Sequence, residues 1–312
     1  MVGIVGSGFG LYGYLPSVVN TTDDKIKLRL KSHEVFIKRP ELQYCKDRIV
    51  WESNDDSFYN SISTLILSVP PIIQSQIIYQ WGHLENIKQI ILEKPIAPNP
   101  AEAKLLLDFL HVNNKKIIVS YTFQYIEWGK KLINLLSLPN PNINSINIEW
   151  NFKAHHYLHD IKNWKRYHSL GGGAIRFYGI HLIALLSLIG YEEVEKSVTK
   201  GFSDDDIFLW EVTFIHNLLP TINISINANA ETNIFNLTHY SSNQQIYSHL
   251  SIEDPFQTQI INGVDKRVPI LNDLINELNF MEQQEKYYST YYQINNLWAQ
   301  IEELNVNSVK TA

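Results

Sequence analysis

The sequence has little cysteine or methionine, no excess of basic residues and no long hydrophobic run. Its single cysteine, Cys45, excludes an intramolecular disulfide framework and is typical of a reducing compartment. The formal net charge of −6 argues against a general binder of nucleic acid or anionic membranes. No window approaches the ~18 uninterrupted apolar residues of a membrane helix, and no basic start leads into an apolar signal region. We therefore expect a cytoplasmic protein with neither nucleic-acid nor membrane partners.

The composition, with 45% hydrophobic and 19% charged residues, is typical of a globular enzyme, and a chain of 312 residues favours two domains. Strand and helix patterns alternate over residues 1–121, with buried-strand runs at 63–69 and 89–93. Residues 25–31 alternate with period two, as a half-exposed, edge-like strand does. This alternation predicts an α/β Rossmann domain, a parallel sheet with helices on both faces.

Residues 122–312 are expected to form an α+β domain for substrate binding and oligomerisation. Strands follow one another there with only turns between them, which predicts a mostly antiparallel, open sheet. Residues 207–216 carry apolar groups on both faces, so a partner subunit is expected to cover one of them. Residues 271–304 return to helical periodicity and are expected to dock on the first domain. The predicted strands are 145–152, 207–216, 221–229, 233–241 and 246–252.

A glycine-dense turn follows the first strand, Val2–Val5. Gly6, Gly8 and Gly10 surround Phe9 at the point where a helix over 11–19 is expected to begin. Such a turn lets backbone N–H groups approach a pyrophosphate at a helix N-terminus, so we predict dinucleotide binding. The third glycine of G-x-G-x-x-G falls at a leucine, and a plain tight turn is the alternative.

The tripeptide Glu93-Lys94-Pro95 follows a predicted buried strand, at the carboxyl end of the parallel sheet, where ligands bind in open α/β sheets. A partly desolvated lysine near a cationic nicotinamide is expected to have a lowered pKa and to exchange a proton with a hydroxyl or carbonyl. The alternative is a surface lysine beside a turn proline.

A triple glycine, residues 171–173, precedes a helix expected over 174–189 that carries His181, with Arg176 and Tyr178 nearby. Glycines let the backbone pass close to another group. His181 is thus a candidate functional residue; a core histidine with satisfied hydrogen bonds is the alternative.

The stretch 153–168 is cationic and rich in histidine and aromatic residues, including Trp164, Lys165 and Arg166. Such a loop suits an anionic substrate, a carboxylate or diphosphate; a solvated loop without a role is the alternative. Its histidines fit no known metal-ligand spacing well, so we predict no metal site.

Together these features resemble the glucose–fructose oxidoreductase / inositol dehydrogenase / rhizopine-catabolism (Gfo/Idh/MocA) family. The family implies a Rossmann domain, a C-terminal domain whose open sheet forms the oligomer interface, and NAD(P)-dependent chemistry on sugars, cyclitols or related carbonyl and imine compounds. By this resemblance Lys94 and His181 take the positions of the catalytic lysine and histidine. The resemblance is carried by residues 2–15, 68–71, 93–95, 121–125, 163–166 and 171–181.

The same resemblance implies the other site residues. For the cofactor these are Gly6, Gly8, Phe9, Gly10, Lys31, Ser32, Ser68, Pro70, Glu93, Lys94 and Tyr121. For the substrate they are Tyr121, Trp164, Lys165, Arg166, Arg176, Tyr178 and His181.

The chain departs from the family pattern at four positions. Phe177 and Ala184 stand where aspartates are usual, and Gln74 and Gln124 stand where a histidine and an arginine are usual. A positioned acid or base contributes about 10²–10⁴ in rate. Either Lys94 and His181 therefore suffice, helped by Tyr178 or Arg176, or the chain no longer oxidises an alcohol.

The second strand is followed by Lys31 and Ser32, which tolerate a 2′-phosphate and favour NADP; Glu34 lies close enough to favour NAD instead. We predict an NAD(P)-dependent oxidoreductase acting on an anionic sugar derivative. A nucleotide-activated (keto)sugar of surface-polysaccharide biosynthesis is the expected substrate, and a homodimer or homotetramer the expected assembly. The alternatives are a dinucleotide-binding sensor or scaffold that has lost catalysis, and an imine reductase of the thiazoline type.

Overall fold

The computed structural model describes residues 1–137, 142–241, 243, 245–254, 260–261, 264–280 and 284–309. The chain forms two compact units. The first unit comprises Met1–Ala97, Leu105–Tyr125 and Phe256–Ser289, and the second comprises Pro98–Lys104, Ile126–Pro255 and Thr290–Ala312.

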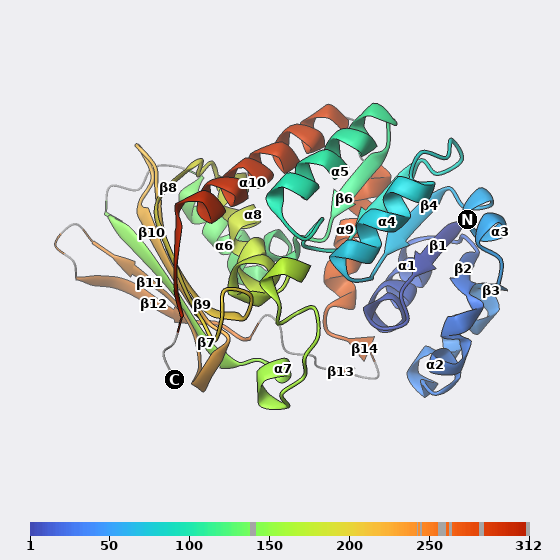
Figure 1. The fold of residues 1–312 in the computed structure, drawn as a ribbon, viewed down its shortest axis with the longest axis horizontal. Coiled ribbons are helices and arrows are strands. Elements are labelled where there is room, and N and C mark those ends of the chain that lie inside the picture. Colours follow the sequence, from blue (N-terminus) through green and yellow to red (C-terminus); the bar gives the residue numbers. More distant parts are fainter. Residues whose placement is uncertain are drawn as a thin grey trace. The chain divides into compact units, whose positions relative to one another are not determined.

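The first unit is built on a six-stranded parallel sheet in the order β3-β2-β1-β4-β5-β6 (Figure 1). This strand order reverses between β1 and β4, which is the topology of dinucleotide-binding folds, and the predicted Rossmann domain is confirmed. The strands are β1 (Val2–Val5), β2 (Ile26–Arg29), β3 (Ile49–Glu52), β4 (Thr64–Leu67), β5 (Gln89–Leu92) and β6 (Lys116–Val119). The helices are α1 (Leu15–Thr21), α2 (His33–Ile37), α3 (Asp55–Asn60), α4 (Pro71–Trp81), most of α5 (Pro100–Val112) and α9 (Val268–Phe280).

Helix α9 reaches the first unit from far along the chain. Its buried face, which includes Leu271, Leu274 and Leu278, joins the same apolar core as Val2 and Ile4 of β1. A short hairpin of β13 (Ile260–Ile261) and β14 (Val264–Asp265) precedes the helix. Residues from β14 and α9 therefore complete the domain that the first strand begins.

The prediction that residues 25–31 form an edge-like strand is wrong. Strand β2 lies between β1 and β3, and its Lys27 is buried. The Lys27 ammonium donates to Ser61 Oγ (2.7 Å) and the Ser57 carbonyl (3.2 Å), and it lies 3.4 Å from Glu52 Oε2. The period-two pattern suggested that the charged positions of this strand are exposed. Lys27 is instead buried, because it has partners on β3 and α3.

The second unit contains a seven-stranded sheet in the order β12-β11-β7-β10-β9-β8-β15. Four neighbouring pairs are antiparallel, but β7 pairs with β10 and β8 with β15 in parallel. The sheet is thus mostly antiparallel, as predicted. The strands are β7 (Ser145–Lys153), β8 (Glu193–Gly201), β9 (Ile207–Ile215), β10 (Thr221–Asn227), β11 (Asn229–Tyr240), β12 (Ile246–Ser251) and β15 (Asn305–Val309).

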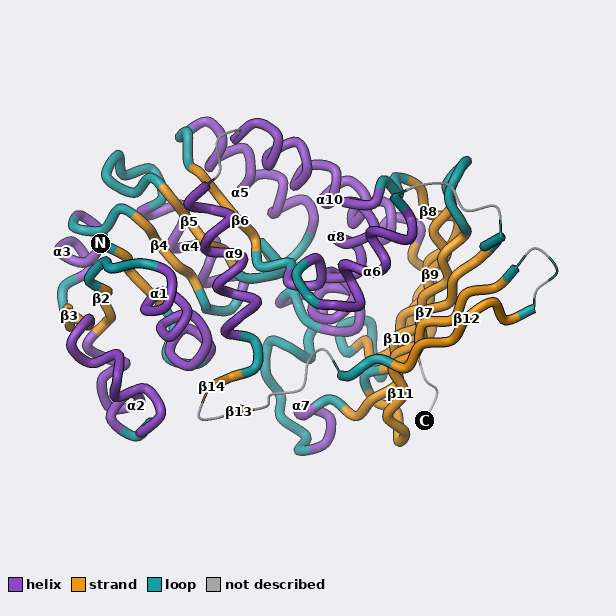
Figure 2. The backbone as a smooth tube through the Cα atoms, turned by 180° about the vertical axis from the view of Figure 1, so that it is seen from behind, coloured by secondary structure: helices purple, strands orange, loops and turns teal. Residues whose placement is uncertain are grey.

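Helices α6 (Glu127–Leu136) and α8 (Ile180–Ile189) cover one face of this sheet, as Figure 2 shows. The stretch His168–Ile189 is long and apolar enough to cross a membrane by length and composition, but 83% of its most apolar window is buried inside the protein, as in a core helix. The unit also contains α7 (His155–Leu158) and most of α10 (Gln284–Leu304).

The other face of the sheet is polar at its centre. Thr213 of β9 donates to Asn223 of β10 (3.0 Å), which donates to Asn147 of β7 (3.1 Å). Glu211 is exposed on the same face, and a cavity of about 410 Å³ lies over these strands. The prediction of apolar groups on both faces of residues 207–216 is therefore wrong at the centre of β9, and it gives no support for a covering subunit.

Candidate functional site

The glycine turn at the end of β1 contains two glycines with different roles. Gly6 has a φ of +133°, and a Cβ there would lie 2.2 Å from the carbonyl oxygen of Ser68, so only glycine fits. A Cβ on Gly8 would meet nothing within 4 Å. Gly6 is thus required by packing against the residue after β4, whereas Gly8 leaves the backbone bare toward open space.

The helix that follows begins differently from the prediction. Gly10–Tyr14 forms a π-helical turn, and α1 starts only at Leu15. Pro16 therefore lies in the first turn of α1, where its missing N–H costs little, and not near the end of a helix over 11–19. Leu11, which stands at the third glycine position, is fully buried in the core of the first unit.

The residues expected to read the ribose lie just after β2. Ser32 is buried, whereas Lys31 and Glu34 are both exposed. The guanidinium of Arg29, at the end of the strand, forms an ion pair with Asp55. The arrangement offers both a cation and a carboxylate to a ribose, so the choice between NADP and NAD stays a prediction.

Lys94 follows β5 in a turn that Gln74 of α4 holds. The fully buried Gln74 amide donates to the carbonyl oxygens of Glu93 (2.9 Å) and Ile96 (3.0 Å), and its oxygen accepts from the Glu93 N–H (2.9 Å). The Lys94–Pro95 peptide bond is cis. A single side chain thus fixes the backbone on both sides of the candidate catalytic lysine.

The Glu93 side chain points to the helix after the glycine turn. Tyr14 donates to Glu93 Oε1 (2.9 Å) and also hydrogen-bonds Ser120, which follows β6. Burial raises the pKa of Glu93 and that of Tyr14, and the neighbouring Lys94 opposes the shift of Glu93. The contacts connect the ends of β1, β5 and β6, next to the buried Tyr121.

In the second unit the triple glycine packs against its own chain. A Cβ on Gly172 would lie 2.2 Å from the Trp164 carbonyl oxygen, and the Gly173 N–H donates to the Lys165 carbonyl (2.9 Å). Gly171 and Gly173 have φ values of +88° and +77°. The prediction that glycine permits a close backbone approach is confirmed, and the group approached is the cationic loop.

This packing assembles an aromatic and cationic cluster, which we call the Lys165 cluster: Trp164, Lys165, Phe177 and Tyr178. The Lys165 ammonium lies 5.3 Å from the centroid of the Phe177 ring. The Phe177 ring also meets the edges of Trp164 (5.3 Å) and Tyr178 (4.8 Å between centroids). Phe177 therefore makes ring and cation–π contacts where the resemblance implies an aspartate.

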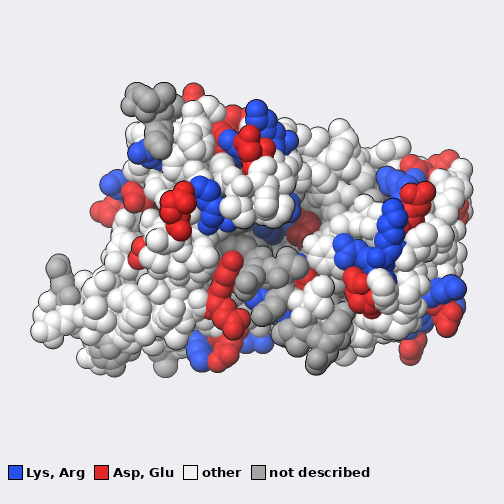
Figure 3. Space-filling view, turned by 90° about the horizontal axis from the view of Figure 1, so that it is seen from below, with Lys and Arg blue, Asp and Glu red and all other residues white. Residues whose placement is uncertain are grey.

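Arg166 and His156 of the same loop face inward, whereas His155 and His159 are exposed. Arg166 donates to Asp206 Oδ2 and Asp160 Oδ1, each at 2.7 Å. His156 is buried beside Tyr178, its Nε2 has no hydrogen-bond partner among the described residues, and burial lowers its pKa to about 4. Figure 3 shows basic and acidic side chains interspersed over the face it depicts, which agrees with such pairing.

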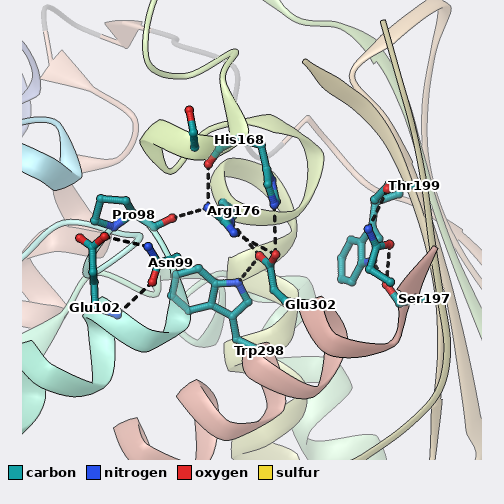
Figure 4. A network of polar contacts seen from close by, with 12 residues as sticks. Pro98, Asn99, Glu102, His168, Arg176, Ser197, Thr199, Trp298 and Glu302 are labelled. Atoms are coloured by element: carbon teal, nitrogen blue, oxygen red, sulfur yellow. Dashed lines mark hydrogen bonds and ion pairs between the residues drawn. The ribbon is translucent and has the colours of Figure 1, made fainter. Parts of the chain in front are cut away.

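Arg176 belongs to a hydrogen-bond network with Glu302 at its centre (Figure 4). Its Nε and Nη2 donate to Glu302 (2.8 and 2.9 Å), and its Nη1 donates to the carbonyl oxygens of Pro98 (2.9 Å) and His168 (2.8 Å). Glu302 also accepts from Trp298 Nε1 (2.9 Å) and His168 Nε2 (3.0 Å). The network joins α10 to the start of α5 and to the segment before α8. Arg176 therefore uses its N–H donors on groups of the protein itself.

His181 lies in the first turn of α8 and is only 5% exposed. It belongs to the second unit, as the Lys165 cluster does, whereas Lys94, Ser68, Pro70 and Tyr121 belong to the first. Among the described residues, no group of three His, Cys, Asp or Glu side chains is placed to hold a metal ion.

Three contributors to these arrangements were not predicted from the sequence: the Gln74 amide as a clamp, Tyr14 as the partner of Glu93, and Glu302 as the centre of the Arg176 network. Gln74 had a usable signal, because it follows the double proline after β4. Glu302 had none, because its charged partners, Arg176 and His168, lie more than a hundred residues away along the chain.

No protein-family model and no curated protein sequence matches the chain. Solved structures of similar fold include KijD10, a 3-ketoreductase from Actinomadura kijaniata in complex with NADP and TDP-benzene (TM-score 0.72, 11% identity, 98% of each chain covered). They also include GenD2 from gentamicin A biosynthesis in complex with NAD (TM-score 0.66, 12% identity, 97% of this chain and 94% of that chain). A super-repressor mutant of Gal80p from Saccharomyces cerevisiae is similar as well (TM-score 0.67, 12% identity, 97% and 95%). At these identities the likeness shows the fold, a Rossmann domain followed by a domain with an open sheet.

Proposed function

We propose that the protein is an NAD(P)-dependent oxidoreductase that acts on an anionic sugar derivative, a nucleotide-activated (keto)sugar of surface-polysaccharide biosynthesis. The observation that carries the proposal is the turn containing Lys94, which Gln74 clamps at the carboxyl edge of the parallel sheet. A cytoplasmic location and a homodimer or homotetramer are part of the same proposal.

The glycine turn fits a dinucleotide. Gly8 presents its backbone to open space, and because glycine has no side chain this space is left free for a ligand. The backbone of Gly6, Gly8, Phe9 and Gly10 would hold the pyrophosphate. When bound, the nicotinamide would exchange a hydride with a carbon of the substrate. Further cofactor contacts are assigned to Lys31, Ser32, Ser68, Pro70, Glu93, Lys94 and Tyr121.

Two side chains are assigned to proton transfer. Lys94 Nζ would give a proton to, or take one from, the oxygen on the reacting carbon, and His181 would act as its partner. Solved structures of KijD10 also carry replacements of one lysine or one tyrosine, and those two residues are separated by as many positions as Lys94 and Tyr178. This spacing supports Lys94 and adds Tyr178 as a helper in place of the missing aspartate.

Substrate recognition is assigned to the Lys165 cluster. Lys165 is exposed and Trp164 half-buried, so a cation and an aromatic face are accessible side by side. A negatively charged group with an attached ring suits this pair. The side chains of Arg166 and Arg176 are only 13% and 11% exposed, whereas Lys165 is exposed, so we assign the anion to Lys165 first.

A second candidate function is a dinucleotide-binding sensor or scaffold without catalysis. Phe177 replaces an acid–base side chain with a ring, and the fully buried Ala184 has no group that could take part in proton transfer. A repressor protein is among the structures of similar fold, which gives this alternative a precedent in architecture.

The first test is a titration of the purified protein with NADH and NADPH, followed by nicotinamide fluorescence. Gly8→Asp places a carboxylate in the open space and is expected to abolish binding without unfolding the protein. Lack of binding to either dinucleotide by the native chain would refute both candidate functions.

A screen of keto-sugar nucleotides, simple sugars and cyclic imines then separates the candidates. Turnover of a sugar nucleotide that Lys94→Ala abolishes, and that the exposed Lys88→Ala leaves intact, would support the oxidoreductase. Turnover of cyclic imines alone would favour the imine reductase. Tight dinucleotide binding with no turnover of any compound would favour the sensor.

A further inference from the structure

The face of the second unit's sheet that lies opposite α6 and α8 carries a cavity of about 410 Å³, which we call the sheet cavity (Figure 2). A volume of this size falls within the range of small-molecule sites, about 300–1,000 Å³. The lining comes from β7, β8, β9, β10 and β11, all of which belong to the second unit. The sheet cavity is therefore separate from the glycine turn, the Lys94 turn and the Lys165 cluster.

One row of polar side chains crosses the sheet cavity from strand to strand. The strand registers place Lys196 of β8 beside Thr213 of β9, followed by Asn223 of β10, Asn147 of β7 and Thr238 of β11. The Thr213 hydroxyl donates to Asn223 Oδ1 (3.0 Å), and the Asn223 amide donates to Asn147 Oδ1 (3.1 Å). A side-chain amide has two donors and an oxygen with two lone pairs, so both amides are held in place and still have capacity for a ligand.

A second row lies two residues further along these strands. It places Glu211 of β9 beside Ser225 of β10, which is followed by Glu149 of β7. Asn151 donates to Glu149 Oε1 (2.7 Å). Within the described part of the chain, the side chains of Glu211, Ser225 and Lys196 have no hydrogen-bond or ion-pair partner, and both glutamates and the lysine are exposed. The two rows thus offer amide, hydroxyl, carboxylate and ammonium groups on one surface.

The charges and apolar groups of the lining decide which ligand the sheet cavity suits. Among the described lining residues Lys196 is the one cation, against two carboxylates, and this balance disfavours a phosphate or another anion. The apolar lining residues Ile148, Val212 and Ile224 are at most 3% exposed, so their side chains belong to the core beneath the sheet. The centre of a protein–protein interface is apolar and poor in charged side chains, so a second copy of the chain would find no such centre here.

A neutral saccharide matches the groups that remain. Each sugar hydroxyl is both a donor and an acceptor, so it pairs with an amide, a hydroxyl or a carboxylate alike. Hydrogen bonds from hydroxyls to Glu211, or from Lys196 to a sugar oxygen, are charge-assisted and therefore stronger than neutral ones. The half-buried Tyr240 also lines the sheet cavity and offers an aromatic ring to the apolar face of a sugar.

We propose that the sheet cavity binds a neutral oligosaccharide. Asn147 and Asn223 form its fixed hydrogen-bonding surface, and Glu211, Ser225 and Lys196 supply further contacts. The site contains none of the residues assigned to the dinucleotide or to the reacting substrate. The proposal therefore goes beyond the proposed function and does not rest on it.

The test is a glycan array of neutral oligosaccharides of glucose, galactose, mannose and N-acetylhexosamines, probed with the intact chain and followed by isothermal titration calorimetry of the compounds bound. Glu211→Ala removes an exposed carboxylate and should weaken binding about 10- to 100-fold, because a charge-assisted hydrogen bond is lost. Glu195→Ala is the matched control, since Glu195 is an exposed glutamate of the same sheet that does not line the sheet cavity, and it should leave the affinity unchanged.

Ser225→Arg fills the sheet cavity with a long side chain and tests a second copy of the chain as the occupant. It should abolish oligosaccharide binding, while thermal unfolding and the molar mass in sedimentation equilibrium stay as in the native chain. A lower molar mass for Ser225→Arg would assign the face to a contact between copies and overturn the proposal. No oligosaccharide bound by the native chain, or equal affinities for Glu211→Ala and the native chain, would also overturn it. NADH and NADPH are titrated in parallel, and their failure to bind the native chain would refute the proposed function while leaving this site standing.

Discussion

Replacing Glu302 by glutamine is expected to destabilise the protein through the loss of one buried charge. The carboxylate accepts four hydrogen bonds, two of them from Arg176, and only 16% of its side chain is exposed. Burial by itself raises the pKa of Glu302, but the hydrogen bonds from His168 and Arg176 outweigh burial and lower the pKa from 4.5 to about 2. A shift of this size corresponds to about 3 kcal/mol in favour of the folded state at neutral pH.

The sign of the pH dependence follows from the direction of the shift. The pKa of Glu302 is lower in the folded chain, so its stabilisation is fully present above pH 4.5 and is lost as the pH falls toward 2. Glutamine does not titrate. The difference in unfolding free energy between the native chain and Glu302→Gln should therefore be about 3 kcal/mol at pH 7 and should shrink steadily below pH 4.5.

Urea denaturation at pH 7, 5, 4 and 3 measures this difference. Glu127→Gln is the control, because Glu127 pairs with Lys131 on an exposed helix face and its loss should change the unfolding free energy little at any pH. A difference for Glu302→Gln that is equal at pH 7 and pH 3 would refute the reasoning, since the stabilisation would then not come from the charge.

Three further predictions concern the turns at the sheet edge and a helix start. Gly6→Ala should unfold more easily by at least about 2 kcal/mol, because its Cβ meets the Ser68 carbonyl, whereas Gly8→Ala should keep its melting temperature; equal melting of the two would contradict this. Gln74→Leu should cost about 2–4 kcal/mol in urea denaturation and lower kcat, since it leaves three buried backbone groups unpaired; an unchanged kcat would show that the clamp does not position Lys94. Asn99→Ala should cost about 1 kcal/mol by thermal unfolding, because Asn99 accepts from the Glu102 N–H (2.9 Å) as the N-cap of α5.

The fold could be predicted where local patterns decide it. Apolar runs such as residues 63–69 mark β4 because a central parallel strand is buried on both faces, and the cap at Asn99 is a local hydrogen-bond pattern. The position of β2 inside the sheet could not be predicted, because it depends on Lys27 finding partners on β3 and α3. The parallel pairing of β7 with β10 was likewise set by contacts distant in sequence.

The candidate site divides in the same way. The glycine turn and Lys94 could be predicted because each follows a strand, and strand ends meet at one edge. The internal pairing of Arg166 with Asp206 could not, since a count of charges along 153–168 does not show which cations have carboxylate partners.

The hydrogen bonds by which Gln74 holds the Lys94 turn do not depend on pH. The resemblance implies a histidine at this position. A neutral imidazole offers one donor and one acceptor, and on protonation it offers two donors and no acceptor. The amide of Gln74 offers two donors and an acceptor at every pH and uses them on the two carbonyls and the N–H around Lys94. The backbone geometry at the lysine is thus uncoupled from acidity, and a pH–rate profile of this protein should report the groups that exchange protons with the substrate and not the scaffold that holds them.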